Sequence, residues 1–368
     1  MRVLYVTTGS LSNNGSIQRA VHLARAGIAF GIESKILILD VAQNRNLVKQ
    51  HGLAMQVHWV RGRNISHYFA QRSTVAWCQV IHLIAPTLAG MALSLEAHRL
   101  GRFVLSDWDE LYLAQADRVF SRIRRCLLQW GCSAVTNGYI FASRALQQWY
   151  LQRDGNKPNT YIPYGLWPLA SSGALQERHE NGSSGWVFYL GGYHRVYRED
   201  LCEVIELARI AAKEGLGLIL AGQGMELPAL KAKLIKILPS SRLKVLGFVQ
   251  DVDDLLRDPE IKLCFLPLKD TLQNRCRCPN KIFHYALAGK MVLTNRVGEV
   301  WEIFGDQVEY YDFVDPESMQ AAFTNALSRH PNYDFPRLSW HERARDYRAV
   351  LERFIKPAQL DPNLRDPR

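Results

Sequence analysis

The sequence lacks the features that mark membrane-spanning, secreted and nucleic-acid-binding proteins. No apolar run reaches the roughly 18–20 residues needed to cross a bilayer. The first residues, Met1–Val6, enter a strand at once and show no signal-peptide cleavage pattern. Long Lys-Arg runs, zinc-finger spacings and aromatic RNA-binding signatures are also absent, so nucleic acid has the least support as a partner. We therefore expect a cytoplasmic protein.

The cysteines form neither a disulfide framework nor a metal site. Their number, seven, is odd, and most lie in apolar surroundings, where free cysteine behaves as a small hydrophobic residue. This usage suits a reducing compartment. Cys276-x-Cys278 has no second cysteine or histidine pair at zinc spacing, so we expect no metal there.

The composition is that of a soluble globular protein with an excess of positive charge. A chain of 368 residues is too long for one compact α/β core, so two domains are expected. Hydrophobic residues make up 48% and charged residues 22%. The net charge of +10 favours anionic partners, which here means phosphorylated ligands or an anionic membrane surface.

Strands and helices alternate twice along the chain, which predicts two parallel sheets, each covered by helices on both faces. We expect a first domain at residues 1–165, a linker at 166–185 and a second domain at 186–339. A helix at 340–356 is long enough to cross back onto the first domain, and 357–368 reads as a disordered tail. The expected strands are 2–6, 34–39, 57–60, 80–84, 103–105, 135–143, 186–190, 216–221, 243–246, 261–266, 291–294 and 308–311.

Two strand ends of the first domain carry candidate site residues. The loop 7–16 has no Gly-x-Gly-x-x-Gly, which argues against a dinucleotide site. Its small residues leave room for a ligand, although a plain helix cap is the favoured interpretation. Asp107, Asp109 and Glu110 follow the strand at 103–105. So many acids after a buried strand are costly unless they are solvated or functional, and a cap for the next helix is an equal alternative.

A basic amphipathic helix is predicted at 114–130. Four arginines alternate with apolar residues, which suits either an anionic membrane or a solvated helix face. We favour the solvated face, because any helix that faces a core shows an apolar stripe. Arg61-Gly62-Arg63 and Arg72, around Tyr68 and Phe69, form a second candidate surface of this kind.

The stretch Asn274–Lys290 joins two strands of the second domain and contains a short helix that Gly289 would end. Arg275, Arg277 and Lys281 stand at the start of this helix, where unpaired N–H groups attract anions. A solvated basic loop explains the same residues equally well.

Three more strand-end loops of the second domain carry glycine or arginine. They are Gly191-Gly192 with Arg195 and Arg198, Gly222-Gln223-Gly224, whose first role is the turn, and Gly298-Glu299. Because the ends of parallel strands meet at one edge of a sheet, these loops converge. They predict a diphosphate ligand held by the second domain, with the first domain facing it across a cleft.

Together these motifs resemble the GT-B glycosyltransferases, family 4-like (group 1). Several marks occur in the family's order over nearly the whole chain. They are Asn14-Gly15, Ser143, Ile162-Pro163-Tyr164-Gly165, Leu190-Gly191-Gly192, Ala221-Gly222-Gln223-Gly224, Leu246-Gly247-Phe248-Val249, Ser339-Trp340 and, most specific, Asn274-Arg275-x-Arg277-x-Pro279-x-Lys281-Ile282 with Tyr285 and Ala288-Gly289-Lys290. Asp107-Trp108-Asp109-Glu110 is similar to an acidic loop of one subgroup.

The resemblance implies two Rossmann-like domains facing across a cleft and a hexosyltransferase-type reaction. Sugar would pass from a nucleotide-diphosphate donor, most simply a UDP-sugar, to an acceptor, with retention and without a metal. Catalytic roles would fall to Arg198 and Lys281 at the leaving diphosphate and to Asp107 and Asp109. Donor contacts would come from Gly15, Ser16, Gly192, Arg195, Gly222, Arg277, His284, Gly298 and Glu299.

The chain departs from the family at two places. The family's paired glutamates are Cys276 and His284 here, and histidine cannot hold a ribose as a carboxylate would. The usual arginine after the strand at 186–190 is Gly192, with Arg195 or Arg198 as substitutes. A core histidine packed on Tyr285 is the alternative for His284.

Two other functions stay open beside the transferase. A nucleotide-sugar epimerase of the same fold would need acid–base groups near the sugar, and His284, Asp107 and Asp109 are the clustered candidates. A non-catalytic nucleotide-sugar-binding subunit would explain the missing glutamates. The acceptor could be a saccharide, a lipid-linked glycan or a small natural product, and peripheral contact with the inner membrane face is one option that the basic helix raises.

Overall fold

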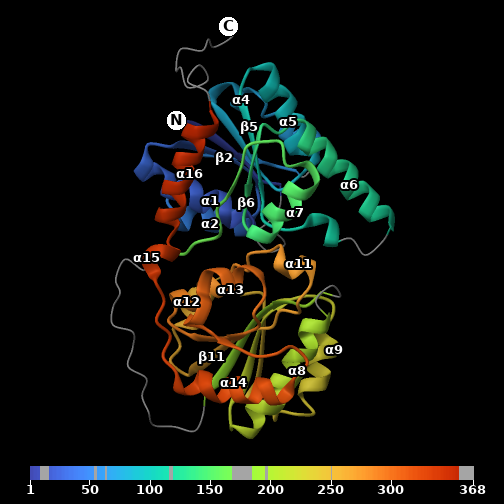
Figure 1. Ribbon diagram of the computed structural model, residues 1–368, viewed down its shortest axis with the longest axis vertical. Coiled ribbons are helices and arrows are strands. Elements are labelled where there is room, and N and C mark those ends of the chain that lie inside the picture. Colours follow the sequence, from blue (N-terminus) through green and yellow to red (C-terminus); the bar gives the residue numbers. More distant parts are fainter. Residues whose placement is uncertain are drawn as a thin grey trace. The chain divides into compact units, whose positions relative to one another are not determined.

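The computed structural model describes residues 1–8, 16–53, 56–62, 64–115, 119–167, 185–194, 198–249 and 251–355, without the side chains of residues 114, 115, 119, 154 and 198. The chain forms two units (Figure 1). Unit 1 comprises Met1–Gly165, the short segment Cys276–Cys278 and the chain from Ser339 onward, and unit 2 comprises Leu166–Arg275 and Pro279–Leu338. Most of the predicted linker and the predicted tail at 357–368 lie outside the described residues.

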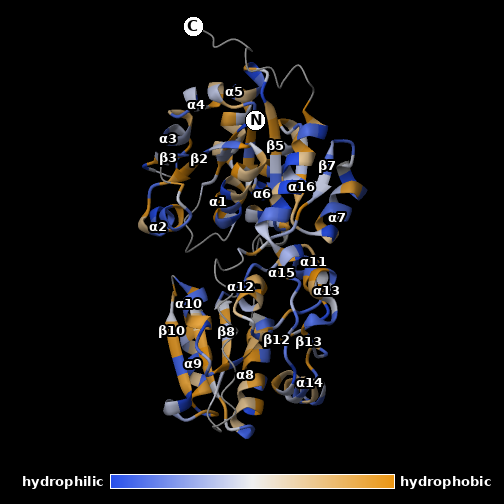
Figure 2. Cartoon of the chain, turned by 90° about the vertical axis from the view of Figure 1, so that its left-hand side faces the viewer, coloured by the Kyte–Doolittle hydropathy of each residue, from blue (hydrophilic) through white to orange (hydrophobic). Residues whose placement is uncertain are grey.

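Unit 1 is built on a parallel sheet. Its strands are β1 (Arg2–Val6), β2 (Glu33–Leu39), β3 (Val57–Val60), β4 (Val80–Ile84), β5 (Phe103–Trp108), β6 (Gly138–Phe141) and β7 (Asn159–Tyr161). Within the described residues their order is β3-β2-β1-β4-β5-β6-β7, so the order reverses between β1 and β4. The strands are largely apolar (Figure 2), and β4 and β5 are buried throughout, as parallel strands between two helical layers must be.

Helices cover this sheet on both faces. They are α1 (Ser16–Gly27), α2 (Ala42–Gln50), α3 (Ile65–Phe69), α4 (Ser73–Trp77), α5 (Leu88–Arg99), α6 (Val119–Ala134), α7 (Arg144–Asp154) and α16 (Trp340–Phe354). The last helix packs against α1, with Trp340 and Tyr347 fully buried, which confirms the predicted return of the carboxyl-terminal helix to the first domain. Ser339 caps α16 by accepting a hydrogen bond from the Glu342 amide, 3.2 Å away.

Several elements of unit 1 differ from the sequence prediction, and two of them hold candidate residues. The strand expected to end at Leu105 continues to Trp108, so Asp107 lies inside β5, in register with Ile84 of β4 and Ile140 of β6. The acidic group therefore starts within the sheet and not in the loop after it. The helix expected at 114–130 is α6, which begins at Val119 and ends at Ala134.

Unit 2 repeats the plan with a second parallel sheet. Its strands are β8 (Trp186–Gly192), β9 (Gly217–Gln223), β10 (Leu243–Gly247), β11 (Ile261–Leu266), β12 (Met291–Thr294) and β13 (Glu309–Tyr310). Their order within the described residues is β10-β9-β8-β11-β12-β13, with the reversal between β8 and β11. The core on one face of this sheet joins apolar residues of β8, β9 and β11 to two covering helices, residues 198–213 and 316–328.

The helices of unit 2 include the short one predicted in the Asn274–Lys290 stretch. They are α8 (Arg198–Lys213), α9 (Leu227–Leu234), α10 (Val252–Leu256), α11 (Leu272–Arg275), α12 (Lys281–Leu287), α13 (Gly298–Phe304), α14 (Pro316–Ser328) and α15 (Phe335–Leu338). The predicted stop of α12 is confirmed, since Gly289 has a φ of 64°, a left-handed conformation that suits glycine. No helix among the described residues is both long and apolar enough to span a membrane.

Candidate functional site

The carboxyl ends of β8, β9 and β12 bring the predicted donor residues Gly192, Gly222 and Gly298 to one edge of the unit 2 sheet. In a parallel sheet a ligand binds beyond these ends, where the strand order reverses. In unit 2 that point lies between β8 and β11. Gly192 ends β8, Gly222 lies near the end of β9, and Gly298 opens α13 just after β12.

The glycines at this edge are required by the backbone itself. Gly222 has a φ of 114°, and a Cβ placed there would lie 1.9 Å from the Gly191 carbonyl oxygen. At Gly224 the φ is 157° and the added Cβ would lie 2.2 Å from the Tyr193 carbonyl oxygen. The ends of β8 and β9 therefore pack backbone to backbone, which supports the turn interpretation of Gly222-Gln223-Gly224.

The backbone also requires a glycine at position 298. Its φ is 51°, and an added Cβ would lie 2.7 Å from the carbonyl oxygen of Arg275. The loop before α13 is held by the Asn295 side chain, which donates to the Tyr311 carbonyl at 2.8 Å and accepts from the Leu268 amide at 2.8 Å. Glu299 follows in the first turn of α13 and is 1% exposed. Close packing thus accounts for Gly298, and the Glu299 side chain points into the unit.

Lys281 is the first residue of α12 and lies beside the point where the strand order reverses. Its ammonium is 5.5 Å from the ring centre of Tyr189 on β8. The buried Tyr285 fastens the same helix to the sheet, because its hydroxyl accepts a hydrogen bond from the Leu190 amide at 3.0 Å. The tyrosine therefore fixes α12, and with it Lys281, against the end of β8.

The other cations predicted near Lys281 have separate surroundings. Arg275 makes a two-armed ion pair with Asp270, Nε to Oδ1 at 2.5 Å and NH2 to Oδ2 at 2.6 Å. Arg277 lies in the segment Cys276–Cys278, which belongs to unit 1. In the same segment, Cys276 is fully buried in an apolar cluster with Trp108 and Leu111. Of the expected trio, Arg275 is thus paired with Asp270, and Arg277 is grouped with unit 1.

His284 has a carboxylate partner from another helix. Its Nδ1 lies 2.6 Å from Oδ1 of Asp253 on α10, and both side chains are partly exposed. The ring is therefore not a core histidine packed only on Tyr285, as the alternative would have it. The carboxylate that this chain lacks at position 284 is present beside it at position 253.

Arg198 begins α8, whose start is held by the Asp200 carboxylate, which accepts from the Lys269 amide at 3.1 Å. The Arg198 side chain, together with Arg195 and Gly15, lies outside the described residues.

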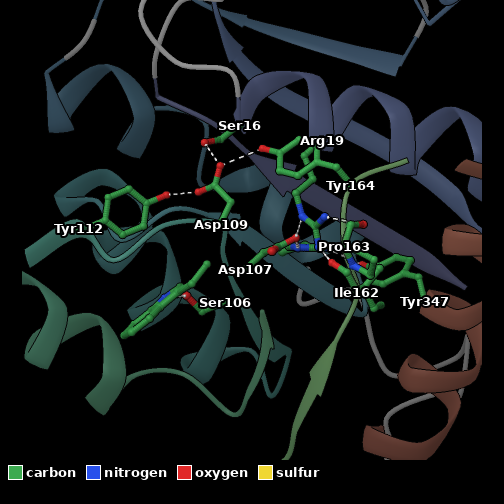
Figure 3. A network of polar contacts seen from close by, with 12 residues as sticks. Ser16, Arg19, Ser106, Asp107, Asp109, Tyr112, Ile162, Pro163, Tyr164 and Tyr347 are labelled. Atoms are coloured by element: carbon green, nitrogen blue, oxygen red, sulfur yellow. Dashed lines mark hydrogen bonds and ion pairs between the residues drawn. The ribbon is translucent and has the colours of Figure 1, made fainter. Parts of the chain in front are cut away.

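The acidic residues predicted in unit 1 form a buried polar network (Figure 3). Asp107 has a fully buried side chain and accepts from Arg19 Nε at 2.6 Å. Arg19, from α1, also donates to the Ile162 carbonyl at 2.7 Å and the Pro163 carbonyl at 3.2 Å. His82 on β4 completes the set, with Nε2 3.1 Å from Asp107. Neither solvation nor a helix cap explains Asp107, because it is one half of a buried ion pair.

The titration of this network follows from its geometry. Burial alone would raise the pKa of Asp107, but the Arg19 guanidinium and then His82 outweigh it, so the pKa lies below its ordinary value. Burial lowers the pKa of His82 despite Asp107, which leaves the imidazole neutral. Its Nδ1 is 2.7 Å from the Tyr347 hydroxyl of α16. The pair therefore ties α1, two strands and α16 together.

Asp109 is surrounded by hydroxyl groups. Ser16 at the start of α1, Tyr112 and Tyr164 all donate to its carboxylate, the last at 2.8 Å (Figure 3). Burial, and next the Asp109 charge, raise the pKa of Tyr112 and of Tyr164 well above the ordinary value, so both stay protonated as donors. Ser16, predicted at the donor, thus uses its hydroxyl on Asp109.

Comparison with solved structures identifies the architecture. HepE of Anabaena, solved with UDP-glucose, superimposes with a TM-score of 0.67 at 14% identity over 96% of this chain and 95% of that chain. The fold is GT-B. The pneumococcal O-GlcNAc transferase GtfA, solved with UDP and GlcNAc, gives a TM-score of 0.69 at 9% identity, covering 96% of this chain and 99% of that chain.

A UDP-GlcNAc 2-epimerase from Neisseria meningitidis shares this GT-B fold, with a TM-score of 0.60 at 12% identity over 96% of this chain and 100% of that chain. No protein-family model and no curated protein sequence matches the chain. The predicted pair of Rossmann-like domains is therefore confirmed as a fold, while the reaction must be argued from the residues.

Sequence reasoning missed several residues that shape these regions. Arg19, His82 and Tyr164 organise the unit 1 network, and Asp253 supports His284 in unit 2. His82 does leave a signal, because it is the one polar residue of the strand Val80–Ile84. Asp253 leaves none, since a pairing across 31 residues has no local pattern.

Proposed function

We propose that this protein is a glycosyltransferase that binds a UDP-sugar at the carboxyl edge of the unit 2 sheet and transfers the sugar with retention. The observation that carries the proposal is Lys281, held by Tyr285 beside the reversal point of a GT-B sheet. HepE and GtfA, which share the fold, were solved with UDP-glucose and with UDP and GlcNAc. That likeness supports a nucleotide sugar as the donor.

The chemistry follows from the charge of the leaving group. When the bond between the sugar and the diphosphate breaks, negative charge develops on the diphosphate, and a fixed cation lowers the barrier most when it is already in place. Lys281 fills this role, and Arg198, at the start of α8, is the second proposed cation. We propose that the reaction needs no metal ion, in line with the family resemblance.

The ribose is the proposed contact of His284. With Nδ1 engaged by the Asp253 carboxylate, the imidazole is oriented and its Nε2 is the nitrogen left to meet a hydroxyl. Gly192, Gly222 and Gly298 give the backbone its shape at this edge, so we assign them to the walls of the site. Because Asp107 is buried and ion-paired in unit 1, we propose that it positions α1 and α16 and does not touch the donor.

An epimerase is the second candidate, since UDP-GlcNAc 2-epimerases share the fold. Such an enzyme needs acid–base groups that reach the sugar. Two of the three candidates, Asp107 and Asp109, are buried and engaged with partners inside unit 1. The pairing of His284 with Asp253 is the one arrangement that favours it. On balance the residues support the transferase more strongly.

The test is a donor panel. Purified protein is titrated with UDP- and GDP-sugars in a calorimeter, and sugar release is followed with and without chelator. We expect saturable binding of a UDP-sugar, and turnover that Lys281→Ala lowers by about 10²–10³-fold, as for the loss of one transition-state donor. Lys233→Ala removes an exposed lysine of α9 and should change nothing.

Other outcomes separate the alternatives. A changed sugar without acceptor means an epimerase, and binding without turnover over a wide acceptor range means a binding subunit. Absence of binding to every nucleotide sugar overturns all three. Equal turnover in the wild type and Lys281→Ala removes Lys281 from the site.

A further inference from the structure

The α6 helix of unit 1 exposes a continuous apolar stripe. Phe120, Ile123, Leu127 and Trp130 are 81%, 53%, 64% and 74% exposed. Spacings of three and four residues put them on one side, within about 80° of arc at about 100° per residue. The sequence favoured a solvated polar face with the apolar stripe turned to the core. That preference is wrong, because the large apolar residues are the ones turned outward.

The last turns of α6 make the packing contacts with α5 and the loop before it. Cys132 is 1% exposed, with its sulfur 3.7 Å from the Thr87 carbonyl oxygen. Gly131 lies so close to Met91 of α5 that an added Cβ would be 2.9 Å from its sulfur. Small residues therefore let α6 pack beside α5, as Figure 1 shows. Within the described residues, no element buries the apolar stripe.

Positive charge flanks the stripe. The helix, VFSRIRRCLLQWGCSA, holds three arginines and no acidic residue. Arg125 is turned inward and donates to the Tyr112 carbonyl at 2.6 Å. Arg122 and Arg124 are exposed, and helix geometry places them on either side of the stripe, at roughly 120° and 80° from its midline. Their long stems allow the guanidinium groups to reach the level of the apolar side chains.

Neighbouring helices of the same unit expose further large apolar residues. Leu88 and Leu95 of α5 are half-exposed or more, and Ile65 and Phe69 of α3, which packs on α5, are about two-fifths exposed. Arg72 lies over the Phe69 ring at 5.2 Å, whereas Tyr68 is buried and belongs to the core. An apolar surface spread over several helices, rimmed by arginine, fits an extended flat partner better than a single peptide.

We propose that α6 lies on an anionic lipid bilayer, with Phe120, Ile123, Leu127 and Trp130 in the interface and Arg122 and Arg124 at the lipid phosphates. The stripe is about 15 Å long and parallel to the helix axis, so the helix would lie in the plane of the surface. A second copy is the less suitable occupant. A two-fold pairing of α6 with itself would set arginine against arginine, with no acid on the helix to compensate.

The test is co-sedimentation with vesicles of phosphatidylcholine containing about 30% phosphatidylglycerol, against vesicles of phosphatidylcholine alone. We expect the wild type to bind the anionic vesicles. Arg122→Gln with Arg124→Gln should weaken partitioning about thirty-fold, as two cations at such a surface contribute. Leu127→Ser with Trp130→Ser should weaken it by on the order of a hundred-fold through lost apolar burial.

Matched controls come from unit 2. Lys231→Gln with Lys233→Gln removes two exposed charges at the same spacing on α9, and Met225→Ser with Ile235→Ser removes two exposed apolar residues. Both should bind vesicles like the wild type. If the controls lose as much as the α6 variants, the binding is unspecific and the proposal fails. It also fails if wild type and α6 variants sediment alike.

A local reading on α6 completes the test. Cys126, beside the stripe, and Cys202 are exposed, whereas the other cysteines are buried. In a Cys202→Ser variant, an environment-sensitive dye on Cys126 should brighten and shift to the blue with anionic vesicles only. Sedimentation velocity without lipid measures whether the protein dimerises, and so tests a second copy of the chain as the partner of the stripe. A dimer that Leu127→Ser with Trp130→Ser abolishes, together with an unresponsive dye, would assign the stripe to a second copy.

Discussion

The two sheets carry polar residues at corresponding edges, but they use them in opposite ways. In unit 1 the Asp107 and Asp109 carboxylates are buried and receive donors from Arg19, His82, Ser16, Tyr112 and Tyr164. In unit 2, Lys281 and His284 are partly exposed, and the glycines keep side chains away from the strand ends. The first edge is an internal polar network, and the second presents side chains that are partly exposed.

The contrast teaches how to interpret clustered charges in a repeated fold. In the sequence both edges offered candidate site residues, the acids of unit 1 and the Asn274–Lys290 stretch of unit 2. Burial decides between the two edges, because a carboxylate that is enclosed by the protein and bound by its own donors has little to offer a substrate. The unit 2 edge keeps the side chains of Lys281 and His284 partly exposed. Accessibility, and not the number of charged residues, separates the buried polar network from the proposed site.

The largest effect is expected from a substitution in the buried polar network of unit 1. Arg19→Leu leaves Asp107 buried without its cation, and removing one partner of a buried pair costs about 3–5 kcal/mol of the free energy of unfolding. Urea denaturation followed by tryptophan fluorescence measures it. Arg45→Leu is the matched control, since Arg45 pairs with Asp40 on the surface of the same unit and should change the stability little. Equal losses in both variants would remove the distinction between the buried and the exposed pair.

The fold could be predicted largely from sequence, because its signals are local. Short apolar runs separated by helical periodicity placed nearly every strand, and Gly289 marked the end of α12. The site could be predicted only in part. Lys281 could be proposed because its motif is local, whereas the partner of Asp107 is Arg19, 88 residues away, and no spacing rule connects the two.

The stripe of α6 shows another limit of sequence reasoning. Amphipathic periodicity reveals that a helix has an apolar side but not where that side points. Here Gly131 and Cys132 make the packing contacts of α6, and such small residues contribute little to a pattern of hydrophobic periodicity. The exposed Trp130 became visible only when the packing of α5 against α6 was known.

A moderate effect on UDP-sugar binding is expected from substitutions of His284 and Asp253 in unit 2. His284→Ala should weaken UDP-sugar binding about ten-fold, the size of one hydrogen bond to a ligand, with little change in unfolding free energy. Asp253→Asn keeps the ring but loses its charged partner, so we expect about a three-fold loss. Calorimetric titration measures both. Asp254→Asn, one residue along α10, should bind like the wild type, and three indistinguishable variants would take the pair out of the site.

The smallest effect concerns the proton on the Glu110 carboxyl in unit 1 and the pH dependence of stability that it causes. Burial, and next the neighbouring Asp109, raise the pKa of Glu110 to about 7. Because the folded pKa exceeds the unfolded value near 4.5, the native state binds the extra proton between these limits, and stability falls as pH rises through this window. Glu110→Gln has no such proton to lose. Its free energy of unfolding should therefore rise relative to that of the wild type between pH 5 and pH 8, by about 1 kcal/mol for a partly exposed group.

Unfolding free energies of both proteins at several pH values between 5 and 8 test this. Glu96→Gln is the control, because the hydrogen bond from Arg99 lowers the pKa of the partly exposed Glu96 and its titration ends below the window. The difference between Glu110→Gln and wild type should widen with pH, while that for Glu96→Gln stays flat. Parallel curves for all three proteins would mean that Glu110 is solvated, and that the buried polar network of unit 1 ends at Asp109.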